Sequence, residues 1–258
     1  MNSATTSLLL LLSASLTPTA AFAATPAPSR LELQYFDLRG AAETSRILLA
    51  IAQQPYTDTR FAIDPSTFQS QSFLEAKQNG SLKMNLNRAP VLLTPEGQTI
   101  GQSKAIERYI AKKFGMMGKT PEEEAVIDCI AEHCRDVRDA ARAKGFSAFN
   151  KQKSEDEKAT ARKEWFETDM PEMLRKIDEA VRETGMESED GRYFYAFGSS
   201  TSYADVAIWA MLRDCLEGDR EDTKKASEGC TVLNKIADGV ESLDGVKKWL
   251  EERPVTMF

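Results

Sequence analysis

The chain has 258 residues and a formal net charge of −7, with 41% hydrophobic and 28% charged residues. This balance is typical of a globular protein and excludes an extended disordered chain. A negative net charge disfavours binding to a phosphate backbone, which needs a clustered basic surface, so no nucleic-acid partner is expected. The length accommodates one large domain or two modest ones.

The first 23 residues have the pattern of a signal or targeting peptide. An apolar run from Leu8 to Leu12 lies in a stretch without charged side chains up to Ala23, and it is too short to span a bilayer as a helix. Ala21-Phe22-Ala23 has the small-x-small pattern of a cleavage site, which predicts removal after Ala23. We therefore expect entry into the secretory pathway, with no stable membrane span after processing; an uncleaved anchor is the alternative. The same stretch resembles the bipartite presequence of algae with secondary plastids, so plastid import is an open alternative.

Residues 24–30 are interpreted as a linker, and strand and helix patterns alternate after it. Leu31, Leu33 and Tyr35 alternate with polar residues, as in a strand, and apolar residues at helical spacing follow Gly40. A turn at 95–97 predicts a hairpin. The expected order is βαβ followed by ββα: a strand over 31–35, a helix around 47–52, a strand over 56–63, a short helix around 73–77, strands over 91–93 and 98–100, and a helix capped by Ser103 that stops at Gly115.

Strand patterns are absent from the second half of the chain, so we expect it to be all helix. Thr120-Pro121-Glu122-Glu123 is typical of a helix start, with a hydroxyl N-cap and proline at the first helical position. The spacing of apolar residues predicts an amphipathic helix over 165–181. Ser202 and Asp205 form a capping box before a helix that is apolar on nearly every side and therefore central. The segment 116–119 is the expected domain boundary.

The four cysteines and the single histidine show no metal-ligand spacing, so no metal is expected. Cys129 and Cys134 are too close along one helix to bridge each other. Cys215 and Cys230 flank a polar loop and could pair in an oxidising compartment. The interpretation that we favour is four buried thiols, and His133 is expected on the surface without a role.

Five motifs follow one another along the chain: Tyr35 to Glu43 (YFDLRGAAE), Ala89-Pro90-Val91, Gln102-Ser103 with Ala105-Ile106 and Arg108-Tyr109, Ser202 with Asp205, and Val246 to Pro254 (VKKWLEERP). Together they resemble the cytosolic-type glutathione S-transferases, closest to the sigma class. The resemblance covers the chain from Leu31 to its end. It implies an α/β thioredoxin-like N-terminal domain over residues 31–115, an all-α C-terminal domain over 120–258 and an active site between them.

The resemblance implies that Tyr35 is catalytic and holds the sulfur of the co-substrate glutathione as a thiolate. A free thiol has a pKa near ~8.5, so most glutathione is protonated at neutral pH and is a poor nucleophile. A hydroxyl that donates a hydrogen bond to sulfur favours the charged form. The expected reaction is conjugation of this thiolate to a small, electrophilic hydrophobic acceptor, as in detoxification.

The resemblance also implies which residues bind glutathione. Ala89 and Pro90 would offer backbone groups to its cysteinyl part at the family's cis-proline turn. Ser103, at a helix start, and Gln102 beside it would bind the γ-glutamyl carboxylate. Lys77 is the candidate for the glycyl carboxylate, against the alternative of a solvated lysine.

Asp136 matches an acidic residue that in the family reaches the glutathione amine across a dimer interface, which implies a homodimer. A surface aspartate paired with a nearby arginine is the alternative. The resemblance places the acceptor pocket at Leu38, Val137 and Ala141, together with the C-terminal tail.

Two positions depart from the family pattern. Ala41 stands where the sigma motif usually has arginine, and the tryptophan expected between residues 64 and 80 is absent, with Phe68 the nearest aromatic residue. Both changes put the affinity for glutathione in question. A glutathione-dependent isomerase or peroxidase that uses the same thiolate, and a non-catalytic binding protein of this fold, therefore remain as alternatives.

Overall fold

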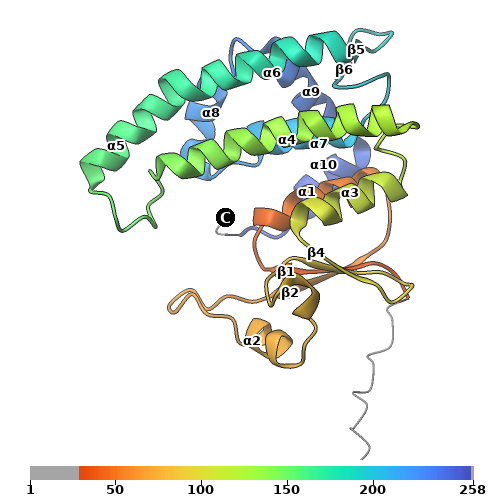
Figure 1. The fold of residues 1–258 in the computed structure, drawn as a ribbon, viewed down its shortest axis with the longest axis vertical. Coiled ribbons are helices and arrows are strands. Elements are labelled where there is room, and N and C mark those ends of the chain that lie inside the picture. Colours follow the sequence, from red (N-terminus) through yellow and green to blue (C-terminus); the bar gives the residue numbers. More distant parts are fainter. Residues whose placement is uncertain (1–28, 257–258) are drawn as a thin grey trace, which may run out of the picture.

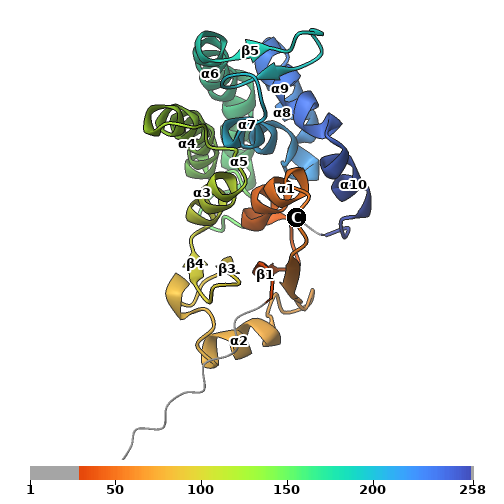
Figure 2. The ribbon, with the colours of Figure 1, turned by 90° about the vertical axis from the view of Figure 1, so that its right-hand side faces the viewer.

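The computed structural model describes residues 29–256 (Figure 1). The peptide over residues 1–23 and most of the linker over 24–30 lie outside the described residues. Two views at right angles show a small sheet at one end of the molecule and a stack of helices at the other (Figures 1 and 2).

The first part of the chain forms a four-stranded mixed sheet in the order β2-β1-β3-β4. β1 (Glu32–Phe36) pairs in parallel with β2 (Thr57–Phe61) and antiparallel with β3 (Val91–Leu93), and β3 pairs antiparallel with β4 (Thr99–Gly101). The predicted strands and hairpin are thus confirmed. Alternating burial explains β1, because Leu33 is fully buried while Glu32 and Gln34 are less so. In β3, Val91 and Leu92 are both fully buried.

Three helices cover this sheet. α1 (Glu43–Ile51) and α3 (Ser103–Lys113) lie between the sheet and the helical part, and α2 (Gln71–Gln78) lies on the opposite face (Figures 1 and 2). The expected N-cap at Ser103 is corrected by one residue: the cap position is Gln102, and Ser103 is the first helical residue.

Seven α-helices form most of the rest of the described chain: α4 (Pro121–Lys144), α5 (Glu155–Glu164), α6 (Met170–Thr184), α7 (Tyr203–Arg213), α8 (Arg220–Ala226), α9 (Thr231–Ser242) and α10 (Asp244–Glu252). The expectation of an all-helical second half needs one correction. A two-stranded ribbon joins α6 to α7, formed by β5 (Met186–Glu187) and β6 (Phe194–Tyr195).

The helix expected over 165–181 begins ten residues earlier, at Glu155. Ser154 and Glu157 form a capping box at this start, with Glu157 N–H donating to the Ser154 hydroxyl at 3.3 Å. A π-helical turn over Trp165–Asp169 joins α5 to α6, and Met170 N–H donates five residues back to Trp165. Since Pro171 has no N–H to donate and its ring would crowd a regular turn, the wider turn accommodates it.

α7 is the central helix, as predicted. Residues 203–212 are all buried, and the helix packs against α4 and α9. Its start is the predicted capping box, in which Asp205 Oδ2 accepts from Ser202 N at 2.8 Å and from Ser202 Oγ at 2.5 Å. The core runs without a break from the sheet into this helix, because Leu33, Ile106 and Trp209 belong to one buried cluster.

All four cysteines are free thiols. Cys134 and Cys230 are buried as expected, but Cys129 is exposed and Cys215 is half-buried, so the interpretation as four buried thiols is wrong for these two. The helix carrying Cys129 turns this position outward. No bond joins Cys215 to Cys230.

None of the helices between residues 29 and 256 combines the length and apolar character that a bilayer crossing requires. Over the same range, no three His, Cys, Asp or Glu side chains are grouped so that they could hold a metal ion.

Candidate active site

Strand register brings Tyr35, Pro90 and Gln102 into one row at the end of the sheet. Gln34 pairs with Val91, and Val91 pairs with Gly101. The residues one step beyond these pairs are therefore neighbours. The peptide bond between Ala89 and Pro90 is cis, as in the family turn that the sequence resembles. We call this row the site end of the sheet.

Asn85 holds two members of this row together. Its side-chain amide donates to Pro90 O at 2.8 Å, and its Oδ1 accepts from Gln102 N at 3.1 Å. Gln102 has φ of 68°, a conformation that costs a non-glycine residue free energy and persists where the surroundings enforce it. Asn85 is itself 4% exposed. Asn85 could not be identified from the sequence, because its two partners are 5 and 17 residues away.

The hydroxyl of Tyr35 is positioned by the loop that follows β1. Ala41 N donates to it at 3.2 Å, and this bond leaves the hydroxyl proton free to be donated elsewhere. Gly40 has φ of +41°, and a Cβ atom on it would lie 2.8 Å from the Tyr35 hydroxyl. The close approach of loop and ring therefore requires glycine.

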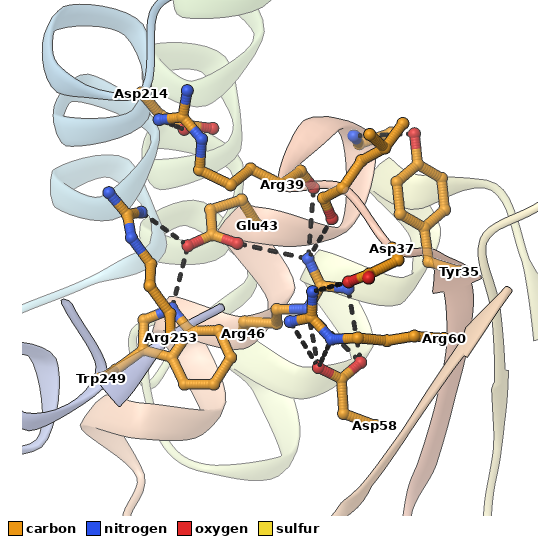
Figure 3. A network of polar contacts seen from close by, with 12 residues as sticks. Tyr35, Asp37, Arg39, Glu43, Arg46, Asp58, Arg60, Asp214, Trp249 and Arg253 are labelled. Atoms are coloured by element: carbon orange, nitrogen blue, oxygen red, sulfur yellow. Dashed lines mark hydrogen bonds and ion pairs between the residues drawn. The ribbon is translucent and has the colours of Figure 1, made fainter. Parts of the chain in front are cut away.

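A buried arginine fixes the same loop from the other side. Arg46, which is 0% exposed, donates to Leu38 O at 2.7 Å and to Arg39 O at 3.3 Å. Its charge is balanced by Glu43 at 3.3 Å and by Asp58 at 3.2 Å. Figure 3 shows Arg46 between these carboxylates, with Tyr35 on the far side of the loop. Because a buried charge is tolerated only with such partners, the loop conformation is closely defined.

Glu43 extends this network to the C-terminal segment. Its Oε1 accepts from Trp249 Nε1 and from Arg253 Nη1, each at 2.9 Å. The loop that carries the site is thus linked to residues more than 200 positions later (Figure 3).

A cavity of about 740 Å³ opens beside Tyr35. Five of the residues predicted for the site line it: Tyr35, Gln102, Ser103, Val137 and Ala141. Val137 and Ala141 lie one helical turn apart on α4 and form part of its wall. The structure therefore brings the expected thiolate-stabilising residue together with two of the expected acceptor-pocket residues, Val137 and Ala141.

The other predicted site residues do not line this cavity, and their roles stay predictions. Leu38 is half-buried in the loop held by Arg46. Ala89 and Pro90 lie at the site end of the sheet. Lys77 is exposed on α2, with its ammonium 5.5 Å from the centre of the Phe73 ring. Asp136 is exposed on α4.

The cavity is more highly charged than expected for a hydrophobic acceptor. Apolar side chains from the π-helical turn and its surroundings, Phe146, Phe166, Met170 and Met211, share the wall with Arg39, Lys104, Glu107, Arg138 and Asp214. Arg39 and Asp214 form an ion pair at 3.1 Å. Burial and the charge of Glu43 raise the pKa of Asp214, while Arg39 opposes this shift. The sequence did not indicate these charged residues because they come from four distant segments.

A second cavity, of about 830 Å³, lies beside the π-helical turn and α8 and is lined by residues including Arg162, Lys225 and Cys230. It contains none of the predicted site residues. Although it is the larger of the two, only the cavity at Tyr35 joins a positioned proton donor to a helix start.

Comparison with known proteins shows which family models the chain matches. The model of the glutathione S-transferase N-terminal domain matches residues 31–112, and that of the C-terminal domain matches residues 141–253. Glutathione S-transferase 1 of Ascaris suum is 28% identical over 239 residues, covering 88% of this chain and 98% of the relative. The hematopoietic prostaglandin D synthase of Gallus gallus is 29% identical, covering 87% and 97%.

Among solved structures, a nu-class glutathione S-transferase from Haemonchus contortus is 28% identical with a TM-score of 0.63, covering 89% of this chain and 99% of that one. The two family models together account for most of the described chain and follow each other in the expected order. The chain therefore belongs to the glutathione S-transferase family.

Proposed function

We propose that this protein conjugates glutathione to small electrophilic acceptors. The observation that carries the proposal is the Tyr35 hydroxyl, which accepts a hydrogen bond from Ala41 N–H at the cavity and keeps its own proton available. Donated to the sulfur of glutathione, that proton favours the thiolate. The thiolate attacks an electrophilic carbon: a C–S bond forms, the leaving group departs with its electron pair, and the thiol proton passes to solvent.

For the other contacts to glutathione we propose the residues that the resemblance implies. Ser103 begins α3, so its hydroxyl and the free N–H groups of the first turn suit the γ-glutamyl carboxylate, with Gln102 beside it. The backbone at Ala89 and Pro90 suits the cysteinyl part. Lys77 would take the glycyl carboxylate. The proposed reaction requires no metal.

The experiment is the ionisation of bound glutathione in Tyr35→Phe. The thiolate absorbs in the ultraviolet, so a pH titration of the complex gives the pKa of the bound thiol, and each unit corresponds to about 1.4 kcal/mol. We expect a higher thiol pKa in the variant and slower conjugation. Tyr56→Phe is the matched control, because the Tyr56 hydroxyl has no hydrogen-bond partner and lies outside this cavity. An unchanged thiol pKa in Tyr35→Phe removes Tyr35 from the mechanism.

Two alternatives use the same fold. An isomerase or peroxidase would use the same thiolate, and assays with endoperoxide and hydroperoxide substrates separate them from the transferase. A non-catalytic binding protein would follow if Ala41 and the absent tryptophan abolish glutathione binding. Retention on immobilised glutathione, eluted with free glutathione, distinguishes the enzyme from a protein that no longer binds it.

We also propose a homodimer of sigma-like class with a role in detoxification. Two large apolar side chains support the dimer, because they are exposed to solvent in the single chain: Met84 is 67% and Leu86 is 75% exposed. Asp136 on α4 is exposed and free to reach a partner's glutathione. Sedimentation velocity tests this, and a monomer at micromolar concentration contradicts it.

The two domains proposed are residues 31–115 and 120–258, preceded by a linker over 24–30 and by the cleaved peptide over 1–23. We propose entry into the secretory pathway, with plastid import as the alternative. N-terminal sequencing of the mature protein tests both, and a start at Met1 or Asn2 contradicts them.

A further inference from the structure

One charged side chain on the wall of the Tyr35 cavity has no partner. Arg138 lines the cavity from α4, and its Nη2 is buried without a hydrogen-bond acceptor. Within residues 29–256 no ion pair or hydrogen bond involves this guanidinium. A buried donor that is left unsatisfied loses its hydration without compensation, so this group favours any ligand that brings an acceptor.

The other charged residues on the cavity wall are already paired. Arg39 pairs with Asp214, Lys104 with Glu107, Arg135 with Glu132, Arg142 with Asp139, and Asp219 with Arg162. Asp214 is close enough for Arg138 to lower its pKa, but its bonded partner is Arg39 (Figure 3). Pairing thus leaves a positive charge at Arg138.

Arg138 lies at the part of the wall assigned to the acceptor. It directly follows Val137 on α4 and precedes Ala141 by three residues, which places Arg138 and Ala141 on one side of the helix. The apolar rings of Phe146 and Phe166 line the same cavity. A ligand that fills this space meets an apolar surface and one unpaired cation.

We infer that Arg138 forms an anion-binding subsite for the second substrate, so that the preferred acceptors are amphipathic electrophiles with an apolar body and a carboxylate. This inference rests on the proposed function and names the substrate class of that same site. A guanidinium binds a carboxylate with charge-assisted, often bidentate hydrogen bonds, which are stronger than those between neutral groups.

The experiment compares two acceptors of nearly equal shape, 4-chloro-3,5-dinitrobenzoate and 4-chloro-3,5-dinitrobenzamide. In both, the thiolate forms a C–S bond at the chlorinated carbon and chloride leaves. The enzymatic kcat/KM for each is divided by its uncatalysed rate constant with glutathione, which removes the difference in intrinsic reactivity. The quantity compared between proteins is the benzoate-to-benzamide ratio.

We expect this ratio to fall by about tenfold or more in Arg138→Leu, from the loss of a charge-assisted hydrogen bond, and to be partly retained in Arg138→Lys. Arg175→Leu is the matched control, since it removes an arginine of α6 that lies outside this cavity, is paired with Glu179 and is exposed. Its ratio should match that of the wild type. An equal ratio in wild type and Arg138→Leu overturns the inference.

A binding measurement keeps this test separate from catalysis. Calorimetry with the unreactive 3,5-dinitrobenzoate and 3,5-dinitrobenzamide measures binding at the subsite without any reaction. If neither chlorinated compound were conjugated, the proposed function would be refuted, but this binding test of Arg138 would still apply. We expect tighter binding of the benzoate to the wild type and loss of this preference in Arg138→Leu. If the variant instead weakens glutathione binding and leaves the preference intact, Arg138 serves the co-substrate and the inference is wrong.

Discussion

At the scale of single residues, the Tyr35 hydroxyl is held by backbone. The donor is Ala41 N–H, and every residue except proline supplies this group. The alanine that replaces the arginine of the resembled motif therefore leaves the contact to Tyr35 in place. A sequence can indicate that the side chain at position 41 differs, but only the loop conformation shows that the amide beneath it faces the tyrosine.

Gly40→Ala should misplace this tyrosine. The added Cβ would lie 2.8 Å from the Tyr35 hydroxyl and 3.2 Å from its Cε1, so ring or loop must move. We expect kcat/KM to fall by about ten- to a hundredfold, as small misplacements of catalytic groups do. Gly80→Ala is the control, because Gly80 also has positive φ, of +82°, but no atom lies within 4 Å of the added Cβ. Equal activity in the two variants would contradict the prediction.

Asn85→Ala should weaken both the fold and glutathione binding. The variant leaves Gln102 N–H and Pro90 O without the bonds that Asn85 provides, and each unsatisfied buried group costs about 1–3 kcal/mol. Urea unfolding and a glutathione titration measure the two effects. Asn79→Ala removes a comparable amide whose Oδ1 accepts from Ser81 N in a solvent-exposed hydrogen bond, and it should change neither. If glutathione affinity is unchanged in Asn85→Ala, the binding geometry at the site end of the sheet does not depend on the Asn85 side chain.

At the scale of elements, the strands of the sheet could be predicted from the sequence, but the start of α5 could not. Strand alternation and the turn at 95–97 are local signals, and their positions agree with the observed strands. The start of α5 is different, because only Lys158 and Ala161 are buried in it. A helix that is exposed on nearly every side shows no apolar periodicity. Only its capping residues could have indicated where it begins.

The capping box of α7 should make stability depend on pH. Burial raises the pKa of Asp205 from 3.8 to about 6, although hydrogen bonds from Ser202 and Ala196 oppose the shift. The native state therefore holds this proton more tightly than the unfolded chain. The protonated Asp205 therefore stabilises the native state. This stabilisation is fully present below the pKa that Asp205 has in the unfolded chain, and it is lost as pH rises through about 6.

Asp205→Asn tests this, because the amide does not titrate. The unfolding free energy of the wild type minus that of the variant should decrease by up to about 3 kcal/mol from pH 4 to pH 7. Urea midpoints at several pH values measure it. Asp190→Asn is the contrast: hydrogen bonds from Ser188 and Arg192 lower the pKa of Asp190 to about 2, so the sign of any change is opposite. A difference for Asp205→Asn that grows with pH would show that the carboxylate is preferred in the native state.

At the scale of the whole molecule, the site depends on contacts between distant segments. Tyr35 and Ser103 could be identified from motifs, since each sits at the end of a local element. Arg138 could not, because its lack of a partner appears only when the cavity wall is assembled. In the sequence Glu43 is likewise an ordinary helical residue, and only the structure shows that Trp249 and Arg253, near the end of the chain, donate hydrogen bonds to it.

The pair Glu43 and Arg253 should couple the C-terminal segment to the loop at Tyr35. Glu43 is 1% and Arg253 22% exposed at the side chain, with 2.9 Å between Oε1 and Nη1. Hydrogen bonds to charged groups contribute about 1.5–3 kcal/mol, so a double-mutant cycle of Glu43→Gln and Arg253→Met in urea should give a coupling of at least about 1 kcal/mol. Because Glu43 is buried, this coupling should persist at ~1 M salt, where the screening length is about 3 Å.

The exposed pair Arg175 and Glu179, at 2.6 Å with side chains 58% and 60% exposed, is the control for this cycle. Its coupling should be small and should vanish in salt, because water and ions screen both charges. Kinetics add a second measure: if Arg253 acts through Glu43 and Arg46 on the loop, Arg253→Met should also lower kcat for a simple acceptor, although no atom of Arg253 lines the cavity. Additive single variants, or a coupling that disappears with salt as the control does, would show that the C-terminal segment packs on α1 without governing the site.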